Sequence, residues 1–318
     1  MWHGVSPLAR SVGDQLQWGG QRSDPGRSSG WAMIPFLNVL FDGFAYGMLL
    51  FLLSVGLSVT LGMMNFVNLA HCSFAMIGAY VTISLTQTLG WPFLATLPMA
   101  FLAAALVSVV LERTLFQRLY RATDLDQCLL TIGIVFVSIA VVAYLYGTTL
   151  QSIKVPSYLQ GSINIGGITM GVYRLFLIAI ALIVAVALVI GIEKTRFGAR
   201  IRAAVDNQRM ARGLGLDVDR IFALTFALGS GLAGLGGALA IQMVGLDNDF
   251  AFRYLIYVLI VVSVGGLGSI GGSFAAAVLL GIADMAGKYY VPQFGAFFIY
   301  AVMVALLMWR PHGLFGRR

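Results

Sequence analysis

The sequence predicts an all-α fold, a polytopic membrane bundle of about eight transmembrane helices. Hydrophobic residues make up 59% of the 318 residues and charged residues only 10%, whereas about 25% charged residues is typical of soluble domains. The apolar residues gather in continuous runs, most of them near the ~20 residues that cross a bilayer as a helix. Because backbone amides in hydrocarbon must be satisfied within their own element, continuous rather than alternating apolarity favours helices over a closed barrel.

The first 32 residues differ in kind from the rest. They are polar, rich in Gly and Ser, and hold no apolar stretch of the length found in a signal peptide. We expect residues 1–32 to be a disordered arm or an over-extended start, and residues 33–318 to form the transmembrane domain.

Helical spans follow from the apolar runs in order. Residues 34–88 are apolar but interrupted at 65–71, so they hold at least two crossings. Residues 254–309 must return the chain across the membrane in a length that is marginal for three full spans. Short, broken or re-entrant helices are therefore expected there, with a break at the glycine cluster 265–272. The spans between are expected at about 93–111, 127–147, 174–192 and 221–244.

The sequence thus predicts one interruption in each half of the chain. In transporters, paired helix breaks point to the solute pathway. The alternative is that the glycines only allow helices to pack closely, which the spacing of Gly229, Ala233 and Gly237 favours for the span at 221–244. Both interpretations stay open at the two breaks.

The distribution of charge predicts how the chain is oriented. The net charge is +7, and thirteen of the 20 Lys and Arg residues lie in three segments, at 113–121, 194–220 and 310–318. Cytoplasmic loops of membrane proteins carry such an excess, so these segments and the C-terminus are expected in the cytoplasm. This pattern indicates membrane topology and not nucleic-acid binding.

Two nucleotide-binding motifs are matched only superficially. Gly266, Gly268 and Gly271 have the G-x-G-x-x-G spacing, but no alternation of strands and helices surrounds them. The stretch 281–288 resembles a P-loop with one residue too many, and Tyr289 stands where a Ser or Thr would hold magnesium. The two cysteines lack metal-like spacing. We therefore expect this chain to bind no ATP, cofactor or metal and to have no enzymatic activity of its own.

An ion-coupled secondary carrier is the alternative of a different class. Such a carrier needs an ionisable group inside the bundle. The candidates are Asp42, His71 and Asp284, and Asp284 is placed to pair with Lys288 one helical turn later. A pair of that kind would leave few groups to carry an ion.

The basic loop at 193–220 is too long and too charged for a simple turn. Asp206 is expected to cap a short helix, and Gly213 and Gly215 are expected to end it in a left-handed conformation. A short amphipathic helix with basic flanks is a docking element for a partner protein. A membrane-surface helix and a solvated loop are the alternatives. The apolar face of that helix would consist of Val205, Met210, Ala211 and Leu214.

Four stretches of the sequence carry a family resemblance. They are GLSVTLG at 56–62 with NLAHCSFAMIGAY at 68–80, TRFGARIRAAVD at 195–206 with GLG at 213–215, VGGLGSIGG at 264–272, and RPHGLFG at 310–316. In combination they resemble the permease subunits of ATP-binding-cassette importers for branched-chain amino acids, specifically the H-type subunit of the leucine, isoleucine and valine system. The resemblance covers about residues 34–318.

The resemblance implies a pseudo-repeated bundle in the bacterial inner membrane that imports a small amino acid. The implied partners are a second, related permease subunit, two cytoplasmic ATPase subunits that use the ATP, a periplasmic solute-binding protein and membrane lipid. Cys72, Ser73 and Gly271 stand where the family commonly has Gly, an acid and Pro. These departures leave the substrate open, and urea and short-chain amides are the other solutes that related systems import.

The resemblance also assigns roles to single residues. The loop around 203–215 resembles a coupling helix, which seats in a cleft of one ATPase subunit and turns its closure into movement of the bundle. The residues expected at that contact are Arg200, Asp206, Arg209, Gly213 and Gly215. The residues expected along the translocation pathway are Asn65, Asn68, His71, Ser73, Gly266 and Gly268.

Overall fold

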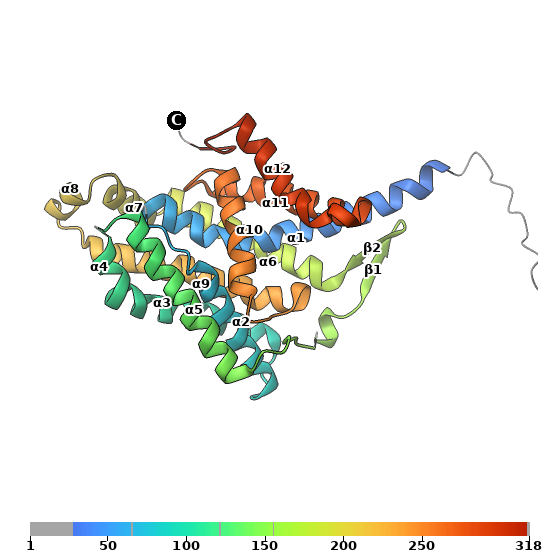
Figure 1. The fold of residues 1–318 in the computed structure, drawn as a ribbon, viewed down its shortest axis with the longest axis horizontal. Helices are drawn as coiled ribbons and strands as arrows, with labels where there is room; N and C mark the ends of the chain where they lie inside the picture. Colours follow the sequence, from blue (N-terminus) through green and yellow to red (C-terminus); the bar gives the residue numbers. More distant parts are fainter. Residues whose placement is uncertain (1–27, 65, 121, 155, 317–318) are drawn as a thin grey trace, which may run out of the picture.

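The computed structural model describes residues 28–64, 66–120, 122–154 and 156–316. This part of the chain is helical almost throughout, which confirms the predicted all-α class (Figure 1). The first 27 residues of the expected arm lie outside the described residues, as does Asn65, which the resemblance assigns to the pathway. The first helix begins at Ser28, so the end of the segment 1–32 is already helical.

Among the described helices, six are long and apolar enough to cross a membrane. They are α1 (Ser28–Met64), α3 (Phe93–Leu111), α5 (Asp124–Tyr146), α6 (Val172–Val189), α9 (Val218–Val244) and α11 (Ile270–Tyr290). Shorter helices are α2 (His71–Gln87), α10 (Phe250–Gly265) and α12 (Gly295–Trp309). The remaining pieces are η2 (Glu112–Phe116), α4 (Gln117–Leu119), η3 (Ser157–Leu159), η4 (Ile190–Lys194), α7 (Arg196–Asp206), α8 (Gln208–Gly213) and η5 (Pro292–Phe294). Short helices at 250–265 and 295–309 agree with the expectation for the last third of the chain.

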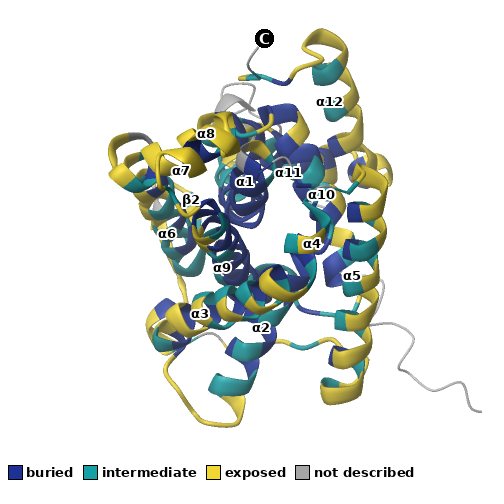
Figure 2. Ribbon diagram, turned by 90° about the vertical axis from the view of Figure 1, so that its left-hand side faces the viewer, coloured by how far each residue is buried: buried dark blue, intermediate teal, exposed yellow. Residues whose placement is uncertain are grey.

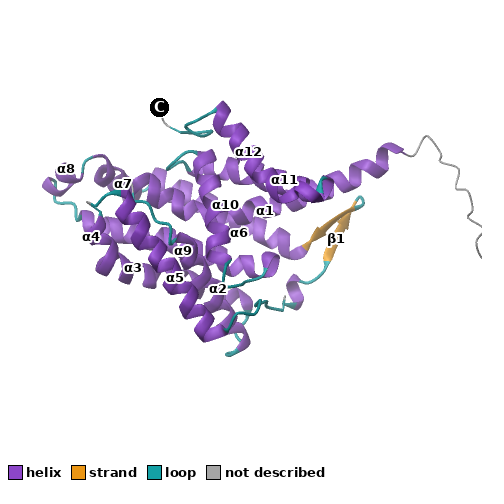
Figure 3. Cartoon of the chain, in the orientation of Figure 1, coloured by secondary structure: helices purple, strands orange, loops and turns teal. Residues whose placement is uncertain are grey.

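A small hairpin lies outside the all-α prediction. Strand β1 (Ser162–Ile165) pairs antiparallel with β2 (Ile168–Gly171), and Figure 3 shows them projecting from the helical body. Gly166 and Gly167 join the strands with positive φ angles of 60° and 90°. Two-residue hairpin turns of this kind favour glycine. Four-residue strands in a polar loop are too short to appear in a search for membrane-length apolar runs.

The centre of the bundle consists of α1 and α9, which are mostly buried, while α3, α5, α6 and α12 expose apolar surface (Figure 2). The central helices approach closely at glycines. A Cβ added at Gly56 of α1 would lie 2.1 Å from the carbonyl oxygen of Gly229 in α9, and one at Gly237 would lie 1.9 Å from the carbonyl oxygen of Ala75 in α2. The small residues of the span 221–244 therefore serve close helix packing, as their spacing predicts.

Both predicted helix breaks are present. α1 ends at Met64 and α2 begins at His71, while α10 ends at Gly265 and α11 begins at Ile270. The Nε2 atom of His71 lies 3.0 Å from the carbonyl oxygen of Leu53. Because Leu53 precedes the end of α1 by about three turns, residues 66–70 run back roughly 16 Å into the bundle. The first break is thus a re-entrant segment, and α2 starts in the protein interior.

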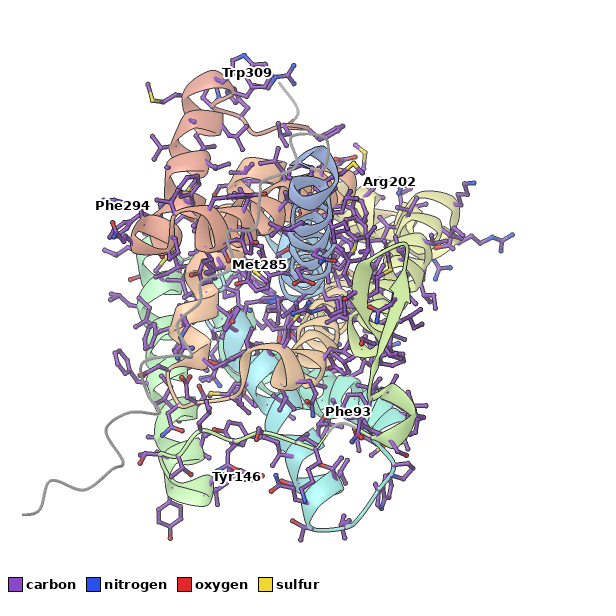
Figure 4. The ribbon with its side chains drawn as sticks, turned by 90° about the vertical axis from the view of Figure 1, so that its right-hand side faces the viewer. Phe93, Tyr146, Arg202, Met285, Phe294 and Trp309 are labelled. Atoms are coloured by element: carbon purple, nitrogen blue, oxygen red, sulfur yellow. The ribbon has the colours of Figure 1, made fainter. Side chains whose placement is uncertain are left out.

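The three basic segments meet at one end of the molecule. Figure 1 shows α4, α7 and α8 together at that end and the hairpin at the opposite end. The C-terminal turn is attached nearby, where Leu314 N donates to Val264 O at 2.7 Å. We call this the basic end, and its cytoplasmic location remains a prediction from the charge pattern. Tyr146 is the last residue of α5 and Trp309 the last residue of α12, and Figure 4 shows them at opposite edges of the bundle.

Candidate functional site

The re-entrant segment 66–70 is held by side chains rather than by a backbone ladder. The ring of Phe66 packs among Phe116, Tyr120 and Phe226, with centroid distances of 5.3, 5.6 and 6.3 Å. Only 1% of Phe66 is exposed. This aromatic contact fixes Phe66 to η2, to the residue that follows α4 and to α9, all near the basic end.

Hydrogen bonds hold the rest of the segment. Gln127 of α5 accepts a hydrogen bond from Val67 N at 3.0 Å, and its amide nitrogen donates to Leu119 O. The Oδ1 atom of Asn68 accepts from Ala70 N at 3.0 Å, which shapes the turn into α2. The Nδ2 atom of Asn68 is buried and has no partner among the described residues. Asn68 therefore shapes the break and still has an unused donor.

His71 begins α2 with a side chain that is fully buried. Its Nε2 donates to Leu53 O of α1, so in this tautomer Nδ1 is the acceptor, and Nδ1 has no partner among the described residues. Ala70 precedes the helix without a side-chain cap. The amides of the first turn, the positive end of the helix dipole, thus lie inside the bundle.

Ser73 lies two positions after His71 in the first turn and links α2 to α5. Its Oγ accepts a hydrogen bond from Ser138 Oγ at 2.9 Å. Asn68, His71 and Ser73 thus all lie at the start of α2, where His71 is directed to α1 and Ser73 to α5. Asn68 and His71 both retain an unpaired polar atom there, and the role of all three in the pathway stays a prediction.

The glycines of the second break lie elsewhere. Gly266 and Gly268 have φ angles of 94° and 77°, in the left-handed region that favours glycine. A Cβ at Gly266 would lie 2.6 Å from the backbone nitrogen of Gly316, and one at Gly62 of α1 would lie 1.9 Å from Gly268 Cα. Along α1, Gly62 lies ~13 Å from Leu53, which His71 contacts. Gly268 therefore lies near the end of α1, about two and a half turns from the level of His71, and close backbone packing accounts for these glycines.

The basic loop forms two helices rather than one. Asp206 is the last residue of α7, and Asn207 caps α8, with its Oδ1 accepting from Met210 N at 2.9 Å. The expectation that Asp206 is the cap is wrong by one residue, because Asn207 has the extended backbone that an N-cap needs. Gly215 has the expected left-handed conformation with φ of 81°, whereas Gly213 is the last residue of α8 and stays outside that region.

The apolar residues of the loop do not share one face. Ala211 is buried against the protein, whereas Met210 is 65% exposed and Leu214 77% exposed. Arg209 and Arg212 flank these exposed side chains, and Arg212 pairs with Asp219 of α9 at 2.8 Å. A single apolar face was the wrong expectation because α8 has less than two turns. The result is an apolar tip of Met210 and Leu214 that faces away from the bundle.

A cavity of about 490 Å³ joins the basic loop to the second break. Arg202 and Asp206 of α7 line one side, and Gly268 lines the other. The remaining wall comes from Gly62, Ile192, Val205, Leu267, Ser269, Ile270, Gly271 and Phe315. Asp206 and Gly268, which the sequence analysis assigns to coupling and to the pathway respectively, thus share one space.

The two acidic residues considered as ion carriers, Asp42 and Asp284, each form an ion pair. Asp284 is buried and pairs with Lys288, the i,i+4 pair expected from the sequence, and Asp42 pairs with Arg174. The sequence analysis did not single out Glu112, whose fully buried carboxylate accepts from Tyr120 Oη at 2.7 Å. The sequence feature that could have identified Glu112 is its position directly after the apolar run 93–111. Within the described residues, no group of three or more His, Cys, Asp or Glu could hold a metal ion.

Comparison with known proteins gives consistent relatives. The chain is 26% identical over 298 residues to the high-affinity branched-chain amino acid transport system permease protein BraD of Pseudomonas aeruginosa, covering 89% of this chain and 96% of BraD. It is 26% identical over 300 residues to LivH of Escherichia coli K12, with the same coverage. LivM of the same organism is 26% identical over 288 residues, covering 84% of this chain and 68% of LivM.

Solved structures offer no significant match. Residues 39–307 match the family described as the permease component of branched-chain amino acid transport systems. That match spans all the helices from α2 to α11, both breaks and the basic loop. This chain belongs to the family of branched-chain amino acid transport system permease components.

Proposed function

We propose that the chain is one permease subunit of an ATP-binding-cassette importer that carries branched-chain amino acids across the bacterial inner membrane. Family membership and the relatives BraD and LivH, which match along nearly their whole length, support this proposal. The separate likeness to LivM supports pairing with a second, related permease. Two ATPase subunits in the cytoplasm and a periplasmic solute-binding protein complete the proposed assembly.

The observation that carries the mechanism is the apolar tip of α8. Met210 and Leu214 are exposed between arginines, and Figure 1 shows α8 at the extreme end of the molecule. Large apolar side chains exposed to water on a polar segment mark an interaction site. A cleft in an ATPase subunit that buries both side chains is the proposed occupant, and acidic residues around the cleft would meet Arg200 and Arg209.

The other assigned residues have separate proposed tasks. Asp206 faces the cavity shared with Gly268, so we assign it to passing motion from α7 to the second break. Gly215 allows the chain to leave α8 in the left-handed conformation, and Gly213 is the last residue of the helix, where an added Cβ would meet no atom within 4 Å. Movement of the tip would then reach the bundle through α7 and the first turn of α9.

The start of α2 is the proposed solute contact. Discontinuous helices of transporters direct their N-termini at the carboxylate of an amino acid substrate. Here the uncapped first turn lies in the interior beside the unpaired Asn68 Nδ2 and His71 Nδ1 atoms. These groups, with Ser73, suit a zwitterion of moderate size. Competition of labelled leucine uptake by valine, urea and acetamide would identify the substrate class.

Reconstitution tests the proposal. The complete complex in proteoliposomes is expected to take up leucine with ATP even when an uncoupler collapses the ion gradient. Uptake by this chain alone, driven by a gradient without ATPase subunits, would instead establish a secondary carrier. The pairs Asp284 with Lys288 and Asp42 with Arg174 favour the first outcome, because a paired acid is a poor ion carrier.

Docking is tested by placing charge on the apolar tip. Replacing Met210 and Leu214 together by Glu is expected to abolish co-purification of the ATPase while the chain still inserts. Leu89→Glu is the matched control, because Leu89 is 63% exposed and lies outside the basic end, between α2 and α3. Retention of the ATPase by the double variant would remove α8 as the docking element.

A further inference from the structure

The cavity at the basic end combines charged and apolar surface in one space. Its volume of about 490 Å³ lies within the ~300–1,000 Å³ of small-molecule sites. One wall is α7, which contributes two charged residues, and the other is the second break with the start of α11. The cavity therefore lies on the side that the charge pattern assigns to the cytoplasm, where an importer releases its solute.

Two charges of opposite sign lie one helical turn apart on the α7 wall. Arg202 and Asp206 both line the cavity, at a spacing that allows an ion pair. Within the described part of the chain they do not pair: the Arg202 guanidinium donates to Ile192 O, and the Asp206 carboxylate has no hydrogen-bond or ion-pair partner. A guanidinium has five N–H donors, so Arg202 keeps donors for a further acceptor. The wall can thus bind a positive and a negative group at the same time.

The start of α11 adds to the positive side of the cavity. Ile270 and Gly271 are the first two residues of this 21-residue helix, and both line the cavity. Ser269 Oγ accepts from Gly272 N at 3.0 Å, which leaves the amides of Ile270 and Gly271 without an acceptor inside the helix. The positive end of the helix dipole favours an anion nearby. A carboxylate in the cavity is therefore favoured by Arg202 on one wall and by α11 on the other.

Large apolar side chains border the same cavity. Leu267 is 61% exposed and Phe315 is 60% exposed, although both lie beside charged residues at the basic end. Phe315 is held there by its backbone, since its amide donates to Gly265 O at 3.2 Å. Exposed apolar surface of this kind gains free energy when an aliphatic group covers it. The cavity therefore offers contacts to a ligand that has both charges and an aliphatic side chain.

The combination of charges favours a zwitterion over a simple ion. Asp206 would repel a simple anion, whereas Arg202 and the start of α11 would repel a simple cation. A free amino acid carries both charges on one carbon atom and satisfies both walls. An aliphatic amino acid also covers the apolar border, which a polar one does not.

We propose that this cavity binds a free branched-chain amino acid from the cytoplasm and thereby inhibits the importer. Asp206 binds the ammonium group, Arg202 binds the carboxylate, and Leu267 and Phe315 contact the side chain. A bound amino acid joins α7 to the second break, so the motion assigned to α7 is held back while the cavity is occupied. The inference rests on the proposed function and goes beyond it, because it adds a regulatory site apart from the proposed solute contact at the start of α2.

The test measures the initial rate of ATP-driven uptake of labelled leucine by the reconstituted complex, with ATP and unlabelled leucine enclosed in the proteoliposomes. Saturating enclosed leucine is expected to lower the wild-type rate at least about fivefold, the lower end of usual coupling between sites. Isocaproate lacks the ammonium group and leucinol lacks the carboxylate, so each should leave the rate unchanged. Inhibition by either compound as strong as that by leucine would contradict recognition of a zwitterion.

Gly271→Leu fills the cavity at a residue to which the proposed function gives no task. An added Cβ at Gly271 meets no atom within 4 Å, so the larger side chain can enter the cavity without displacing α11. This variant should take up leucine at the wild-type rate into vesicles without enclosed leucine and should lose the inhibition. Gly133→Leu is the matched control, because Gly133 of α5 is equally uncrowded and lies outside the cavity. It should be inhibited as the wild type is.

Removal of single charges tests the two polar contacts. Arg202→Gln and Asp206→Asn should each raise the concentration of enclosed leucine that halves the uptake rate by about tenfold, as loss of a hydrogen bond to a charged group predicts. Each rate is compared with that of the same variant without enclosed leucine, because Asp206 also has a proposed task in coupling. Unchanged half-inhibitory concentrations in both variants would contradict these contacts.

Two results would overturn the regulatory site. Enclosed leucine could leave the wild-type rate unchanged, or it could inhibit the wild type and Gly271→Leu equally, which would place the inhibiting leucine in the translocation pathway. The proposed function fails separately, if the wild-type complex takes up no leucine with ATP into vesicles without enclosed leucine.

Discussion

Gly56→Ala probes the closest contact between the two central helices. The added Cβ would lie 2.1 Å from the carbonyl oxygen of Gly229 and 3.0 Å from Cε1 of His71. Non-bonded heavy atoms are at their best separation at about 3.5–4.0 Å, so α1 and α9 must move apart by more than about 1 Å. Overpacking of this kind costs ~1–3 kcal/mol. We expect the free energy of unfolding to fall by that amount and the hydrogen bond from His71 to Leu53 to lengthen.

The assay compares melting temperatures of the detergent-purified chain carrying Gly56→Ala or Gly133→Ala. Gly133 lies within α5 with no atom within 4 Å of an added Cβ, so Ala there is expected to stabilise the helix by up to ~1 kcal/mol. The two variants should therefore differ by about 1–4 kcal/mol although the chemical change is the same. Equal melting temperatures would refute the close approach of α1 and α9.

Three further predictions concern single residues. Asn207→Ala removes the cap of α8 and should cost about 1 kcal/mol of local helix stability, measured as faster amide hydrogen exchange of residues 208–213 in the assembled complex. Gly215→Ala should cost ~1–2 kcal/mol from backbone strain alone, because φ is 81° there and an added Cβ would meet no neighbour. Gly213→Ala should be neutral, because Gly213 has no positive φ and an added Cβ there also meets no neighbour. ATP-driven uptake by the two variants is compared, and equal effects would contradict the geometry. Lys288→Met removes the half-exposed partner of the buried Asp284 carboxylate and should cost about 1–3 kcal/mol; adding Asp284→Asn should recover part of the lost melting temperature, and no recovery would show that the pair is not coupled.

The candidate site could be predicted in part. The breaks were predictable because Asn68, His71 and Gly268 are polar residues or glycines inside apolar runs, and such interruptions are visible without knowledge of neighbours. The depth of His71 and of Gly268 in the bundle could not be predicted, because it depends on which residue of α1 each one contacts. His71 contacts Leu53, and Gly268 contacts Gly62. The cap of α8 was missed by one residue, since adjacent Asp and Asn have equal capping ability and only the backbone distinguishes them.

The ring contacts of Phe66 with Phe116, Tyr120 and Phe226 are visible only in the folded chain. Phe66, Tyr120 and Phe226 are separated by 54 and 106 positions, and each one alone is an ordinary aromatic residue of an apolar chain. Glu112 is visible as an acid at the end of a span, but its partner Tyr120 is not. Contacts of this kind arise only when η2, α4, α9 and the re-entrant segment are packed together, so only the structure identifies them.

Local apolarity and charge were enough to predict the fold class, the places where the spans break and the grouping of the basic loops. The tertiary structure alone decided that residues 66–70 turn back into the bundle, that Met210 and Leu214 face away from it, and that Phe66 lies among the rings of Phe116, Tyr120 and Phe226. The reason is physical. Burial of a chain segment in a membrane is a property of its own composition, whereas the choice of neighbours is set by shape complementarity among helices that are all similarly apolar.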